Sequence, residues 1–220
     1  MPRTPAGPFL MMLAAANVCL HVAGLVLALI GMSPGTPLAS LPARLEYLAG
    51  APLGWTLGWT VWMICSALLI AFLAAVVARL GDDDLARLGL MIAVAGVAFD
   101  LFCDSVYIIV FPMIAAMRPP PETLFLTLER ATGIASMVIA NGAYSAAILL
   151  ISVALRGRER CGPFTVGVGY AVAGFGLLLA GAGFTGVPWH AEWATPPTIG
   201  LFCVWVVLVA RALQPAGRPR

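Results

Sequence analysis

Long apolar stretches with almost no charged residues recur along the whole chain, separated by short segments rich in proline, glycine or charge. Each stretch is close to the roughly 20 residues that an α-helix needs to cross the hydrocarbon core of a membrane. Apolar and polar positions do not alternate as they do in transmembrane β-strands. The pattern predicts six membrane-spanning helices, over residues of about 8–32, 54–80, 85–117, 123–155, 163–187 and 197–213.

A shorter helix is predicted between the first two spans, over residues 37–52. Leu41, Leu45 and Leu48 recur there at helical spacing, with Arg44 and Glu46 between them. This segment is too short to cross a bilayer, and its amphipathic pattern favours a helix that lies in the membrane interface. The predicted fold is therefore an all-α integral membrane protein, a six-helix bundle with one interfacial helix, in a single transmembrane domain over 1–220.

The ends of the predicted spans follow from helix-breaking residues. Ser33-Pro34-Gly35 ends the first span, whose apolar run is longer than the core of a secretory signal. We therefore expect it to be a retained span. The polar segment 188–193 is predicted to be a turn that leads into the sixth span.

Composition excludes a soluble domain, because 61% of the 220 residues are hydrophobic and 10% are charged, whereas about 25% are charged in soluble domains. The twelve basic residues are all arginine and lie at helix ends, with no patch typical of nucleic-acid binding. Abundant alanine, glycine and proline alongside arginine favour a bacterial source. We therefore expect the bacterial inner membrane.

The arginines also predict the orientation of the six spans. If both termini are cytoplasmic, nine arginines lie inside and three, at positions 44, 118 and 130, lie outside. This distribution agrees with the positive-inside rule.

Two carboxylates inside the third predicted span are the most informative polar residues. Asp100 and Asp104 are four residues apart and so share one helix face, with Tyr107 on the next turn. A charged side chain at the centre of a bilayer costs at least about 2.5–3.5 kcal/mol. Some other group should therefore compensate these carboxylates.

The candidate partners lie on the first and fourth spans. Asn17 and His21 share one face of the first span, and Asn141 lies near Tyr144 and Ser145 on the fourth. We expect a polar centre that joins the first, third and fourth spans, with Asp100, Asp104, Tyr107 and these side chains binding a ligand or protons.

A second cluster gathers at the predicted outer face. Its charged members are Glu129, Arg130, His190 and Glu192, and tryptophans at 55, 59, 189 and 193 accompany them. One interpretation is an aromatic belt with loop charges. The other is an outer mouth above Asp104 that admits a polar or cationic ligand.

Three interpretations of the carboxylates remain open. They pin helices together through hydrogen bonds, or they exchange protons with His21 and line a path for an ion or small solute. In the third, the Asp100-x-x-x-Asp104 spacing resembles that of intramembrane prenyl transferases, which implies Mg²⁺ bound to a diphosphate. The second acidic motif and the basic residues of those enzymes are not visible beside it.

The function that we predict is binding or transport of a small solute or ion through a polar intramembrane pocket centred on Asp100 and Asp104. The alternatives are an accessory subunit of a larger membrane complex and, ranked below both, an intramembrane lipid-modifying enzyme. The chain carries no familiar nucleophile, phosphate-binding or zinc motif, which disfavours the common enzyme classes. The partners we expect are the lipid bilayer with a small solute, ion or lipid, and a homo-oligomer or membrane-protein partner is open. No cofactor or metal is assigned.

Overall fold

The computed structural model describes the backbone of residues 7–185 and 188–214, and the side chains of 8–185 and 193–214. Helices follow one another along this part of the chain. In order, they are α1 (Gly7–Ile30), α2 (Leu41–Ala49), α3 (Leu53–Leu80), α4 (Asp84–Ala115), α5 (Glu122–Gly133), the π-helix η1 (Ile134–Ala140), α6 (Asn141–Leu155), α7 (Pro163–Thr185) and α8 (Pro188–Ala212).

The six predicted spans and the short helix between the first two are confirmed. Six helices within the described residues are long and apolar enough to cross a membrane. One of them, Glu122–Leu155, is a continuous rod made of α5, η1 and α6. The chain is a multi-pass membrane protein whose backbone polar groups are satisfied inside helices, as a lipid environment requires.

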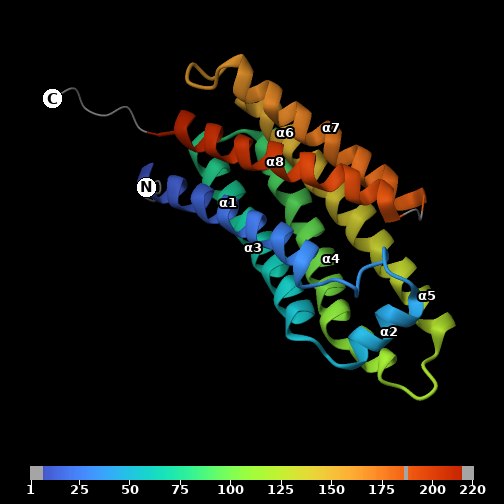
Figure 1. The fold of residues 1–220 in the computed structure, drawn as a ribbon. Coiled ribbons are helices and arrows are strands. Elements are labelled where there is room, and N and C mark those ends of the chain that lie inside the picture. The colour runs from blue at the N-terminus through green and yellow to red at the C-terminus, as the bar shows by residue number, and fades with distance from the viewer. Residues whose placement is uncertain (1–6, 186–187, 215–220) are drawn as a thin grey trace.

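The long helices run side by side, and each returns alongside a neighbour (Figure 1). The start of α1 and the end of α8 lie at one end of the bundle, which we call the terminal end. Helix α2 and the start of α5 lie at the opposite end, which we call the α2 end. Helix α4 packs against α3 and α6, whereas α1 packs against α3 and α8.

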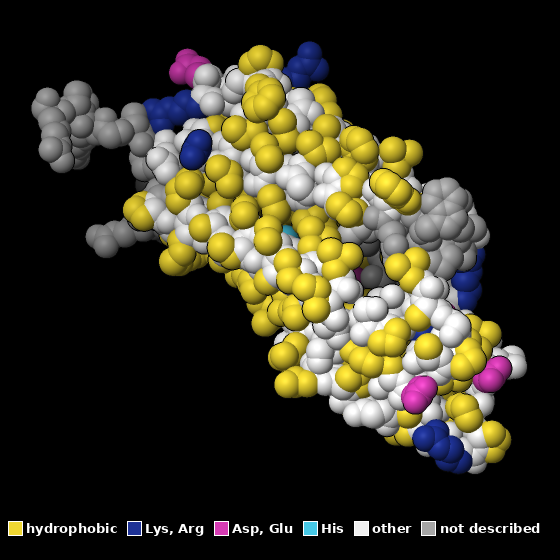
Figure 2. Space-filling view, in the orientation of Figure 1, with side chains coloured by type: hydrophobic (Ala, Val, Ile, Leu, Met, Phe, Trp, Pro, Cys, Tyr) yellow, Lys and Arg dark blue, Asp and Glu magenta, His cyan; other side chains and the backbone are white. Residues whose placement is uncertain are grey.

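Hydrophobic side chains cover much of the surface seen in Figure 2, and charged side chains gather near the two ends of the molecule. Many large apolar residues are exposed along the rods, among them Leu29 (79%), Met91 (70%) and Phe102 (66%). Such a surface is unfavourable in water but suits contact with lipid tails.

Helices α6 and α7 approach closely where glycines of α7 face serines of α6. A Cβ atom added to Gly176 would lie 2.1 Å from Ser145 Oγ, and one added to Gly169 would lie 2.0 Å from Ser152 Oγ. Small residues permit this contact, as is common between membrane helices. Gly174, by contrast, faces open space.

The turn predicted over 188–193 is wrong, because α8 begins at Pro188 and runs through Pro196 and Pro197. Proline removes a backbone hydrogen bond within a helix, so the sequence favours a break there. In apolar surroundings, however, a helix still satisfies most of the backbone, and membrane helices tolerate proline for that reason.

The α2 end has its own small core, which holds the interfacial helix in place. Leu45 and Leu48 of α2 pack with Trp55 of α3 and with Phe111 of α4. Burial of these large side chains fixes α2 beside α4, next to the turns that carry Tyr107.

Candidate functional site

Asp100 of α4 is the centre of a hydrogen-bond network that joins three spans. Its Oδ2 accepts bonds from Ser66 Oγ of α3 at 2.8 Å and from Tyr144 OH of α6 at 3.0 Å. Its Oδ1 accepts a bond from Ser136 Oγ of η1 at 2.8 Å. A carboxylate only accepts hydrogen bonds, and three hydroxyl donors suit its ionised form. Asp100 can therefore hold a negative charge inside the bundle.

Asp104 lies one turn further along α4 in a different environment. The residue is 1% exposed, and its Oδ2 has no hydrogen-bond partner. No described side chain or backbone N–H donates to this carboxyl group. An ionised carboxyl buried without a donor or counter-ion is very costly, so such a group takes up a proton instead. The Asp100–Asp104 pair is thus suited to hold one negative charge and one proton.

Of the side chains expected on the fourth span, Tyr144 does reach Asp100, as described above. Asn141 instead donates from Nδ2 to the backbone carbonyl of Ser136 at 3.1 Å. That carbonyl belongs to η1, where the hydrogen-bond register of the helix changes. Asn141 therefore does not bond to Asp100 itself but stabilises the segment that carries Ser136, one of the donors to Asp100.

Asn17 and His21 are not brought to Asp100 in the described structure. Asn17 Nδ2 donates to the carbonyls of Leu13 and Leu68, and His21 Nδ1 donates to the carbonyl of Asn17 at 2.8 Å. The His21 ring lies against Phe202, with ring centroids 4.8 Å apart. These contacts follow from the position of α1, which packs on α3 and α8.

Tyr107 lies in a layer of aromatic rings between Asp104 and the α2 end. Its ring stacks on Trp59 with centroids 4.1 Å apart and an interplanar angle of 5°, and on Phe111 at 5.0 Å. Trp55 Nε1 donates to the Tyr107 carbonyl at 2.7 Å. Tyr107, which we expected to bind a ligand or protons beside the carboxylates, is therefore in contact with aromatic rings.

At the α2 end, Glu129 of α5 forms an ion pair with Arg44 of α2. Arg44 is 5% exposed, and its guanidinium lies 5.3 Å from the centroid of the Phe125 ring. Burial lowers the pKa of Arg44, and the nearby Tyr107 opposes that shift. The sequence pattern placed Arg44 on an interfacial helix but gave no sign that it would be buried.

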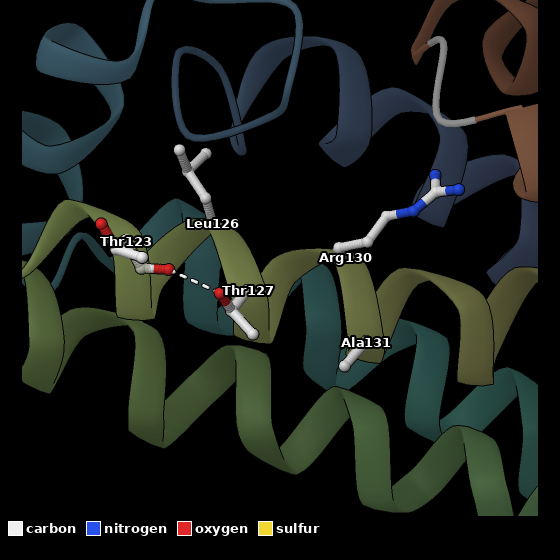
Figure 3. A pocket seen from close by; sticks show the side chains of 5 residues that line it. All are labelled: Thr123, Leu126, Thr127, Arg130 and Ala131. Atoms are coloured by element: carbon white, nitrogen blue, oxygen red, sulfur yellow. Dashed lines mark hydrogen bonds between the residues drawn. The ribbon is translucent and has the colours of Figure 1, made fainter.

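Arg130, the neighbour of Glu129, points to a different helix. Its guanidinium donates to the carbonyls of Gly183 at 3.4 Å and of Phe184 at 2.7 Å. It also borders an open cavity of about 570 Å³ lined by Thr123, Leu126, Thr127, Arg130 and Ala131 (Figure 3). The side chains of His190 and Glu192, the other predicted members of the mouth, lie outside the described residues.

Two residues of the Asp100 network, Ser66 and Ser136, are missing from the sequence prediction. Each is a small hydroxyl residue inside an otherwise apolar span. The signal that could have found them is the need of Asp100 for donors, since a serine costs little to insert and can donate to a neighbouring helix.

Within the described residues, no group of three or more His, Cys, Asp or Glu side chains could hold a metal ion. Comparison with known proteins found no matching family model, no matching curated protein and no matching solved structure.

Proposed function

We propose that this protein binds a small ion or solute at the Asp100–Asp104 pair and moves it within the membrane. Asp100 acts as the fixed anionic centre and Asp104 as the carboxyl group that exchanges its proton or its ligand. The observation that carries this proposal is the contrast between the two groups. Three hydroxyls donate to Asp100, whereas Asp104 is 1% exposed and its Oδ2 has no partner.

A purely structural role explains Asp100 but not Asp104. Hydrogen bonds to Asp100 link α3, α4 and the fourth span, which is a known way to pin membrane helices. A second carboxyl group that accepts no hydrogen bond from the described residues adds no such link and makes insertion more costly. Ionisable residues of this kind in membrane proteins mark ion paths and proton relays.

We also propose that the protein lies in a bacterial inner membrane with both termini in the cytoplasm. In support, the described arginines at 79, 87, 156, 158, 160 and 211 belong to the terminal end, and those at 44, 118 and 130 belong to the α2 end. Positive charge favours the cytoplasmic side. The α2 end would then face outwards.

Reconstitution of the full chain into proteoliposomes tests the ion-binding function. Proton and monovalent-cation flux would be followed for the wild type, Asp104→Asn and the matched control Glu159→Gln, a change at an exposed loop carboxylate. Native mass spectrometry of the same proteins would detect a retained solute. We expect Asp104→Asn, but not Glu159→Gln, to lose the flux or the bound solute.

Infrared spectroscopy gives a second readout, which does not depend on the ligand. The carbonyl stretch of a protonated carboxylic acid should be present in the wild type and absent from Asp104→Asn. If Asp104→Asn folds and matches the wild type in flux, bound solute and infrared spectrum, the proposed function is wrong.

A further inference from the structure

The Arg44–Glu129 pair joins the interfacial helix to the fourth span where few charges are expected. The two side chains are 6% and 19% exposed, so water screens them weakly. A buried ion pair is costly to form, and removal of one partner leaves an uncompensated buried charge. Among the described residues Arg44 Nε has no hydrogen-bond partner, so the pair with Glu129 is the main compensation for this guanidinium.

The aromatic layer around Tyr107 begins next to this ion pair and continues towards Asp104. Arg44 lies over Phe125, Phe125 meets Phe111 edge to face at 5.0 Å, and Phe111 stacks on Tyr107. Phe111 follows Asp104 by seven residues on α4, a rise of about 10 Å along the helix. The rings therefore lie between the Asp104 carboxyl group and the ion pair at the α2 end.

The fourth span connects this closure to the Asp100 network. Glu129 lies on α5, before η1, and Ser136 lies within η1. The Tyr107 hydroxyl lies 3.9 Å from the position that a Cβ atom would take on Gly133, at the junction of the two segments. Single π-helical turns inside longer helices often occur at functional sites. A change in the register of η1 would turn α5 relative to α6.

We propose that the Arg44–Glu129 ion pair is a latch that closes the α2 end of the bundle over Asp104. In the structure the Arg44–Glu129 pair is formed, and Asp104 is 1% exposed. Release of Glu129 from Arg44 allows α2 and α5 to separate, so that water and a small ion or solute reach Asp104. The identity of the ion or solute that the latch admits rests on the proposed function. The opening and closing of the latch does not, because it involves only the contacts between helices.

Accessibility of buried thiols tests the latch without any measurement of transport. Cys65 and Cys103 are 2% and 0% exposed, and they would be the two thiols kept after Cys19, Cys161 and Cys203 are replaced by alanine. The solubilised protein would be treated with a water-soluble cationic thiol reagent. We expect slow labelling with the latch intact, and labelling about tenfold faster or more in Arg44→Gln and Glu129→Gln, because each leaves a buried charge without its partner.

The double variant Arg44→Glu/Glu129→Arg should restore slow labelling, since it rebuilds the pair with the charges exchanged. Arg130→Gln, which changes the adjacent arginine, should leave labelling slow. The latch is wrong if the neutral variants label no faster than the parent, or if Arg130→Gln labels as fast as Glu129→Gln. Loss of ion binding in Asp104→Asn with slow labelling retained would support the function and the latch separately.

Discussion

Ser136 donates a 2.8 Å hydrogen bond to Asp100 from inside η1, a π-helical segment of seven residues in the middle of the fourth span. Within such a segment the side chains after the register change point in directions that a regular α-helix would not give them. The same rod carries Glu129 before η1 and Tyr144 after it. The π-helix thus determines how the latch and the carboxyl network are oriented relative to each other.

The first prediction concerns the hydroxyl donors to Asp100. Ser66→Ala and Ser136→Ala should each lower the free energy of unfolding in detergent by about 1 to 2 kcal/mol, because each removes a hydrogen bond to a partly buried carboxylate. Chemical unfolding followed by circular dichroism would measure the change. Ser105→Ala is the control, since Ser105 bonds only to the Leu101 carbonyl of its own helix, and it should have a much smaller effect. Equal losses in all three variants would contradict the role of the network.

The carboxylates and Tyr144 could be predicted from the sequence because they are unusual residues in apolar spans. Ser66 and Ser136 could not be, since a serine in a membrane helix commonly bonds to its own backbone and then says nothing of its neighbours. The position of the Ser136 side chain depends in addition on the π-helix, and no residue of 134–140 predicts a π-helix.

The choice of helix neighbours was also beyond the sequence. Asn17 and His21 have the depth and spacing to meet Asp100, but α1 packs against α3 and α8. Six apolar helices of similar length can be arranged in several ways, because lipid and helix surfaces are equally apolar and the pattern of each helix favours no particular neighbour. The existence and length of each helix could be predicted, because they depend on the hydropathy of the segment itself.

A second prediction concerns the contact between α6 and α7. Gly176→Ala should destabilise the protein by about 1 to 3 kcal/mol, the usual cost of an extra methyl group in a tight contact, because the new Cβ would lie 2.1 Å from Ser145 Oγ. Gly174→Ala should be neutral or slightly stabilising, because nothing lies within 4 Å of its new Cβ. Thermal unfolding in the same detergent would compare the two. A larger loss in Gly174→Ala than in Gly176→Ala would argue against the helix packing.

A third prediction follows from Cys161, which lies in the segment between α6 and α7. Burial raises the pKa of the Cys161 thiol, and the nearby Arg158 partly opposes this shift. At a given pH a thiol with a raised pKa has less of the reactive thiolate. Two proteins with a single cysteine each would be compared. The first keeps Cys161 and has its other four cysteines replaced by alanine, and the second has all five replaced by alanine and carries Glu159→Cys. Alkylation of Cys161 should be slower than alkylation of the exposed thiol at position 159. The rate for Cys161 should keep rising at a pH where the rate for the exposed thiol has levelled off. Identical pH profiles would show that burial does not hold back this thiol.

A final prediction tests whether η1 determines the position of Glu129. Insertion of one alanine after Ile139, a 44% exposed residue of η1, should rotate α5 by roughly 100° relative to α6, because the wide turns of the π-helix already accommodate one extra residue and cannot absorb a second. Glu129 would then no longer face Arg44. In the chain without the insertion Arg44→Gln should cost about 3 to 5 kcal/mol, as is typical when a buried ion pair loses one partner.

In the insertion variant the same Arg44→Gln change should cost far less, because the pair is already broken. Unfolding free energies of the four proteins give this coupling directly, and Ile139→Ala, which keeps the chain length, is the control that should retain the full cost. If Arg44→Gln costs as much in the insertion variant as in the chain without the insertion, then α5 keeps its orientation whatever the register of η1. The latch and the Asp100 network would in that case be set independently of each other.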